Sequence, residues 1–426
     1  MSPHSPTPPA AGAPRAHGWP QALLTVLAGF LAMGATAALG LWAAGAGDLP
    51  EGAFPKVLAA VVLLAVGGSV EITGDAGALA ESDAALTALP LSVTVVGALV
   101  VGAAFLRPLR HRAVAGAPEL AGWALRIAVL WLLGLAGLGA LARHTFSFSF
   151  EDPTGGLIGD LFGVEPRVGF ATEVPQTLVI GLLWLAGVAV LALMVSRGAP
   201  LPARLLRYQE AVRPTAYAMV ALLLAAVAVG VVIGLVVAAT RGHPAETFAV
   251  LLLGLPNLMW LALTIGLGGS WEGTVEGPFG LPMPQLLDEV LRTGDLATLD
   301  LGTLTERDGR AWWLLVGAAV LVLAAGFLAA VRSPARVRPW QHALHLAVAL
   351  AVTVLCVSLL ARVSAHYGLS LLGIGDLGGD LGGEVSLQPR LWSGVALGAG
   401  WGLVAGFAGG LLATRFRHHG EVPPPS

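Results

Sequence analysis

Residues 67–75 read GGSVEITGD, and residues 268–276 read GGSWEGTVE. The two stretches share the pattern G-G-S-x-E-x-T-x-[D/E], and each one closes a strongly apolar segment. A carboxylate at the end of a membrane segment is energetically costly and is often functional. The recurrence of the whole pattern predicts that the chain arose by internal duplication.

The composition predicts an integral membrane protein. Of the 426 residues, 56% are hydrophobic and only 12% are charged, whereas soluble domains carry about 25% charged residues. Long apolar stretches recur along the chain and are typical of membrane-spanning helices. We therefore expect an all-α polytopic fold with ten apolar segments, near 20–44, 55–71, 88–106, 120–142, 175–196, 214–239, 246–268, 311–331, 340–361 and 391–414.

Two shorter repeated sequences support the duplication and place its boundaries. The tripeptide Leu-Ala-Arg ends the fourth and ninth segments, and Ile-Gly-Asp precedes the fifth and tenth. We expect one membrane repeat over 19–213 and a second over 214–417, with an outer-loop insertion at about 273–310. Short tails, disordered by composition, are expected at 1–18 and 418–426.

The distribution of charged residues in the loops indicates the membrane topology of the chain. Arginines cluster after the third, fifth, eighth and tenth segments, at 107–112, 197–213, 332–338 and 415–417. All four clusters face the cytoplasm if the second and seventh segments enter from outside and turn back. This predicts eight crossings plus two re-entrant segments in parallel repeats, with both termini cytoplasmic in a bacterial plasma membrane. The alternatives are ten crossings in inverted repeats, or a second segment that lies on the membrane surface.

The candidate functional residues belong to the repeated acidic pattern at 67–75 and 268–276, which we call the repeated acidic phrase. They are two carboxylate pairs and the hydroxyl between the members of each pair: Glu71, Thr73 and Asp75, and Glu272, Thr274 and Glu276. Brought together by a pseudo-two-fold axis, the four acids would form a negative vestibule that attracts cations or relays protons. The competing interpretation is that they are solvated outer-loop acids and that the threonines cap helices.

The sequence lacks the motifs that are typical of other classes of function. Cys356 is the only cysteine, which excludes intrachain disulfides and cysteine-based metal sites. The sequence has no H-E-x-x-H, P-loop, dinucleotide-binding pattern or nucleophile elbow. We therefore predict no enzyme activity, no cofactor, no metal and no nucleic-acid partner, and the lipid bilayer as the main partner.

Two further patterns predict packing and surface features. Glycines recur at every fourth position at 398, 402, 406 and 410, which favours close helix packing inside the protein over a dimer face. Residues 285–292 form an amphipathic helical pattern within the outer loop.

The sequence resembles the streptophobe family, very hydrophobic actinobacterial membrane proteins. The resemblance rests on GAFP at 52–55, GGSVE at 67–71, GDAG at 74–77, LPLSV at 89–93, FLRPLRHR at 105–112 and GPFGLP at 277–282. It implies a polytopic membrane protein of the Streptomyces type. It carries no established activity, so no functional residue is transferred from it.

These observations favour passage of a cation, a proton-coupled substrate or another small solute across the membrane, with the paired acids near the outer entrance. The alternative is a non-transporting scaffold that binds a partner in the cell envelope. A membrane-embedded enzyme ranks third. The sequence leaves the solute, the direction of movement and the oligomeric state open.

Overall fold

The structure is a computed structural model that describes residues 18–50, 52–75, 80–109, 117–147, 167–196, 203–275, 297–334, 337–371 and 383–417. Almost all of both predicted tails, the amphipathic pattern at 285–292 and Glu276 lie outside the described residues.

Seven helices are long and apolar enough to cross a membrane, counted over the described residues. They are α1 (Trp19–Ala43), α4 (Ala117–Leu141), α6 (Val174–Val195), α7 (Ala203–Thr240), α12 (Trp313–Arg332), α13 (Pro339–Ala361) and α14 (Leu391–Arg417). Large apolar side chains on these helices face outward, as lipid-facing helices require. The prediction of a polytopic membrane protein built on apolar helices is confirmed.

The second and seventh predicted segments do not form straight spanning helices. The second is α2 (Ala53–Ala65), whose 13 residues are too few to cross a bilayer. The seventh is split into α8 (Pro244–Leu253) and α9 (Leu255–Gly266), which are bent by 75°. The break lies at Gly254, and Pro256 in the first turn of α9 lacks the N–H that would continue the helix. This bent pair is either a broken span or a re-entrant segment.

α2 and α9 end in the same turn. Gly67 has φ +95° and Gly268 has φ +94°, a left-handed conformation that glycine adopts at little cost. The amide of Gly68 donates to Leu63 O at 2.9 Å, and the amide of Gly269 donates to Thr264 O at 2.9 Å. These six-residue closures are Schellman motifs, which satisfy carbonyls at the helix end and reverse the chain.

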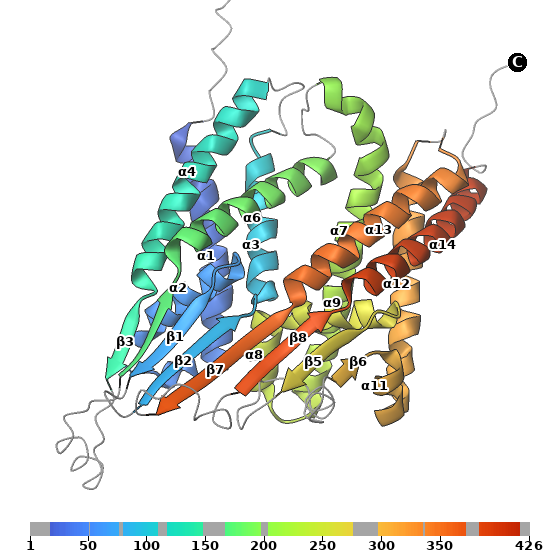
Figure 1. Cartoon of the computed structure of the whole chain (residues 1–426). Coiled ribbons are helices and arrows are strands. Elements are labelled where there is room, and N and C mark those ends of the chain that lie inside the picture. Colours follow the sequence, from blue (N-terminus) through green and yellow to red (C-terminus); the bar gives the residue numbers. More distant parts are fainter. Residues whose placement is uncertain are drawn as a thin grey trace, which may run out of the picture.

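Each turn leads into a strand of an eight-stranded antiparallel sheet, which the sequence did not predict. The strands are β1 (Val70–Asp75), β2 (Ala80–Thr87), β3 (His144–Ser147), β4 (Arg167–Thr172), β5 (Trp271–Val275), β6 (Ala297–Leu299), β7 (Val363–Leu371) and β8 (Gly383–Pro389). Their order is β3-β4-β1-β2-β7-β8-β5-β6. The sheet lies across the lower part of Figure 1, below the α4–α6 and α13–α14 helix pairs, and β2 and β7 join its two halves.

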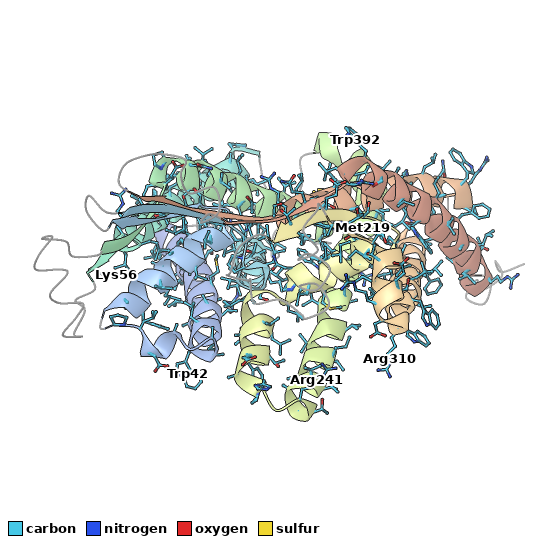
Figure 2. All side chains as sticks on the ribbon, turned by 60° about the horizontal axis from the view of Figure 1, so that its bottom comes forward. Trp42, Lys56, Met219, Arg241, Arg310 and Trp392 are labelled. Carbon is cyan, nitrogen blue, oxygen red and sulfur yellow. The ribbon has the colours of Figure 1, made fainter. Side chains whose placement is uncertain are left out.

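One face of the sheet is apolar and packs on helices. Trp271 of β5 and Leu299 of β6 form a register pair and are fully buried with Trp260 and Ile265 of α9. The Trp271 Nε1–H donates to Thr264 Oγ1 at 3.0 Å, so the indole is also satisfied as a donor. Figure 2 shows the sheet edge-on, with Trp42, Arg241 and Arg310 far below it on one side.

Helix contacts follow the same pattern in the two halves of the chain. α1 contacts α2, α3 (Leu91–Leu106) and α4, and α7 contacts α9, α12 and α13. α6 contacts α3 and α4, and α14 contacts α12 and α13. Three short elements complete the fold: α11 (Leu301–Arg307) and the 3-10 turns η1 (Ala46–Asp48) and η2 (Gly309–Trp312).

The glycines at every fourth position of α14, at 398, 402, 406 and 410, pack inside the molecule, as predicted. A Cβ on Gly402 would lie 2.5 Å from Ala347 Cα, and one on Gly406 would lie 2.5 Å from His342 O. The backbones of α13 and α14 therefore touch, which larger side chains at these positions would prevent.

An amide clamp joins the two halves beside the α8–α9 break. Asn257 Oδ1 accepts the Leu91 N–H at 3.1 Å, and Asn257 Nδ2 donates to Leu89 O at 2.9 Å. The Ser92 hydroxyl donates to Leu251 O at 2.9 Å. Since Leu91 begins α3 (Leu91–Leu106), a side chain of the second half caps a helix of the first.

Candidate functional site

The repeated acidic phrase forms strands rather than helix ends. Glu71, Thr73 and Asp75 occupy alternate positions of β1, and Glu272 and Thr274 occupy alternate positions of β5. Alternate residues of a strand share one face of the sheet. The backbone therefore places these residues on one sheet face.

The register puts both copies of the phrase on the same face. Cross-strand partners share a face, and the chain of partners can be followed from β1 to β5. The polar residues on this face are, strand by strand, Thr145 and Ser147 (β3), Arg167 (β4), Glu71, Thr73 and Asp75 (β1), Glu81, Asp83 and Thr87 (β2), Ser364, His366 and Ser370 (β7), Glu384, Ser386 and Gln388 (β8), Glu272 and Thr274 (β5) and Thr298 (β6). Ala85, Ala171, Gly169 and Gly368 lie among them. The opposite positions are mainly apolar, including Val70, Ile72, Phe170, Val385 and Leu387.

Side chains described at the β5–β8 end agree with this assignment. Thr274 Oγ1 and Ser386 Oγ, which belong to a register pair, are 3.2 Å apart and hydrogen-bonded. Glu272 forms a hydrogen-bonded ion pair with Arg390, the residue that follows β8. Gln388, the register partner of Glu272, is exposed. The polar face thus reaches solvent at this end of the sheet.

The sheet does not bring the two acid clusters together. β2, β7 and β8 lie between β1 and β5. Four strand spacings of about 4.8 Å place Glu71 and Glu272 on the order of 19 Å apart across the sheet. Within the described residues, no group of three or more His, Cys, Asp or Glu side chains is placed to hold a metal ion. The backbone register therefore places Glu71 and Glu272 on one face of the sheet, on strands that are not neighbours.

The two copies also differ in their charge partners. Arg390 stands between β8 and α14 and pairs with Glu272. The corresponding link between β4 and α6 is Glu173, an exposed acid. Glu272 therefore has a counter-charge in the link before α14, whereas the link before α6 adds a negative charge.

The sequence contains a signal for this strand that the prediction of apolar segments did not use. Residues 70–75 alternate apolar and polar side chains at Val70, Glu71, Ile72 and Thr73, a period of two that is typical of half-buried strands. Asn257 gave no such signal, because its partners Leu89 and Leu91 are more than 150 residues away in sequence.

No family model, curated protein or solved structure matches the chain.

Proposed function

We propose that the protein is a membrane scaffold that presents the polar face of its sheet to a partner in the cell envelope. The observation that carries this proposal is the register of the sheet, in which each of the eight strands contributes polar residues to one face. It gives one surface, shared by both halves of the chain, to which Glu71, Asp75 and Glu272 belong. The proposal assigns the chain no catalytic activity.

The acidic character of the face indicates the kind of partner. By register, the β1–β2 hairpin alone contributes Glu71, Asp75, Glu81 and Asp83 to this face. By register Asp75 stands opposite Glu81 on one side and Arg167 on the other, so only part of the negative charge of β1 and β2 has a counter-charge on a neighbouring strand. A partner with a basic surface would complement the remaining acids, and charge complementarity would orient it on the sheet.

The proposal includes a fold of two parallel repeats. Three observations support it: the matched turns at Gly67 and Gly268, the matched helix contacts, and a sheet order in which β3-β4-β1-β2 is followed by β7-β8-β5-β6. In this arrangement α1, α3, α4 and α6 correspond to α7, α12, α13 and α14 and supply eight crossings. α2 and the α8–α9 pair are the two re-entrant segments, and both termini are cytoplasmic in a bacterial plasma membrane.

Site-specific photocrosslinking in intact cells tests whether a partner protein binds the polar face of the sheet. A photoreactive residue at Gln388 or Thr298 on the polar face should give a discrete protein adduct. The same residue at Trp340, which is exposed at the start of α13, serves as the control. The adduct should disappear when Glu71 and Asp83 are both replaced by Lys. The proposal would be contradicted if the adduct persists after this charge reversal. It would also be contradicted if no adduct forms at either Gln388 or Thr298.

Passage of a cation or another small solute is the second candidate, and the bent α8–α9 pair favours it. Backbone breaks at membrane depth occur where protein buries them or where they line a water-filled cavity. Flux into proteoliposomes that contain the Glu71→Gln plus Glu272→Gln variant tests this function. An unchanged flux and an unchanged pH dependence would exclude the repeated acids from the path.

The likeness to the streptophobe family remains a prediction from sequence. It agrees with a multi-pass membrane protein and adds no activity to either candidate function.

A further inference from the structure

An apolar groove lies between the end of α1 and the helix α8. Its volume is about 330 Å³, at the lower end of the range of roughly 300–1,000 Å³ that is typical of ligand pockets. The groove therefore suits a slender apolar group rather than a large ligand. The residues that line it are Leu39, Trp42 and Ala43 of α1 and Ala245, Phe248 and Leu252 of α8.

The groove starts where α1 and α8 touch. A Cβ on Gly40 would lie 2.7 Å from Leu253 Cδ2 and 3.2 Å from Leu252 Cβ, so the glycine allows α8 to pack directly on the backbone of α1. From this contact the groove runs toward Ala43, the last residue of α1, and Ala245, the second residue of α8. The groove is therefore a fixed feature of the packing of these two helices.

The groove opens onto the lipid-facing surface of the protein. Leu39 and Trp42 are exposed on α1, a helix that is long and apolar enough to cross the membrane. Phe248 is exposed on the opposite wall. Tryptophans at the ends of spanning helices lie at the level of the lipid headgroups. Trp42, in the last turn of α1, therefore places the groove at the depth where the acyl chains begin.

The charges at this end of the groove favour no particular headgroup. Arg241 and His243 belong to the turn between α7 and α8, which lies at the same end of the molecule as Trp42 (Figure 2). Glu246 Oε1 is 3.7 Å from His243 Nδ1, and Asp48 is exposed on η1, which packs beside Trp42. Because charges of both signs are present, the apolar walls determine what binds.

We propose that the groove between α1 and α8 binds one acyl chain of a membrane phospholipid. The choice of occupant follows from continuity, because the exposed walls formed by Leu39 and Trp42 continue the lipid-facing surface of α1. A chain in the groove makes van der Waals contacts with two helices at once, whereas a chain on a single helix contacts only one. The site does not rest on the scaffold function, and its failure would leave the surface of the sheet untouched.

Native mass spectrometry of the purified full-length protein in detergent tests the site, with phospholipid titrated into delipidated protein. The unmodified chain should retain one phospholipid, and its Tm should rise in a saturable way by a few degrees. Ala245→Trp and Ala43→Trp fill the groove from its two walls. Each should weaken lipid binding at least about tenfold, because the added indole takes the place of the acyl chain and removes its contacts.

Ala35→Trp is the matched control, since it makes the same change at an exposed position of α1 outside the groove. It should keep both the bound lipid and the rise in Tm. Phosphatidylglycerol and phosphatidylethanolamine with the same chains should be retained equally, and retention of only one of them would overturn the assignment to the acyl chain.

Two further results would overturn the proposal. One is equal lipid retention in the unmodified chain, Ala245→Trp and Ala43→Trp, which would mean that the lipid binds elsewhere. The other is a dimer that Ala245→Trp converts to monomers, which would mean that a second copy of the chain occupies the groove.

Discussion

The matched turns at Gly67 and Gly268 allow backbone strain to be separated from steric overlap. Both glycines have nearly the same positive φ, and alanine in this conformation costs about 1–2 kcal/mol. Their surroundings differ, however. A Cβ on Gly268 would lie 3.5 Å from Leu397 Cδ1, an ordinary contact. A Cβ on Gly67 would lie 2.6 Å from Ile180 Cγ2, which requires one of the two to move.

The expected costs follow from this difference. Gly268→Ala should lower the free energy of unfolding by about 1–2 kcal/mol, the cost of strain alone. Gly67→Ala should cost about 1–3 kcal/mol more, since overpacking a filled site adds that amount. Ile180 offers little relief because its Cγ2 is attached directly to Cβ and χ1 of a β-branched side chain is stiff. The turn of α2 should therefore be the more sensitive of the two.

Denaturant titration of the detergent-solubilised protein, followed by tryptophan fluorescence, measures these differences. Gly45→Ala is the control for strain without overlap, because Gly45 has φ +87° and a Cβ added to it would meet no atom within 4 Å. In a double-mutant cycle, Ile180→Ala should recover most of the additional loss in Gly67→Ala. If Gly67→Ala costs no more than Gly45→Ala, the close packing of α2 on α6 is refuted.

Three further outcomes are expected in the same assay. Asn257→Leu should cost about 2–4 kcal/mol, because it leaves the first amide of α3 buried and unpaired; a loss below about 1 kcal/mol would contradict the clamp. A double-mutant cycle on Glu272 and Arg390 should give a coupling below about 1 kcal/mol that shrinks with salt, since the side chains are 37% and 56% exposed. Gly402→Leu should abolish folding or cost about 3 kcal/mol or more, while Gly400→Leu, with open space around it, should be nearly neutral; equal effects would contradict the α13–α14 packing.

The helical part of this fold was predictable because a membrane-spanning helix is determined by the sequence of its own segment. The segment expected at 340–361 is α13 at Pro339–Ala361, since a long apolar run is by itself sufficient to define a spanning helix. The failure of the second and seventh segments to form straight spans was also predictable, from the glycine pairs and from Pro55 and Pro256. Each of these signals lies within a few residues of the feature that it determines.

The sheet was not predictable in this way, because its central pairing is non-local. β2 and β7 pair through Ala84 and Tyr367, which are 283 residues apart in the chain. The strand β2 reads AESDAALT, in which Ala, Glu, Ser and Asp are weak strand formers. Its conformation is imposed by the neighbours on both sides. A pattern of this kind becomes visible as a strand only once its partners are known.

The two turns share their backbone and differ in the side chains packed beside it. Both have the glycine pair, and the strands that follow carry an alternating acid and threonine, in β1 and in β5. Beside the turns the side chains differ, with Val70 opposite Thr172 in one and Trp271 opposite Pro389 in the other. Since both turns carry the same backbone hydrogen bonds, a different sensitivity of the two turns to substitution would come from these neighbours and not from the turn itself.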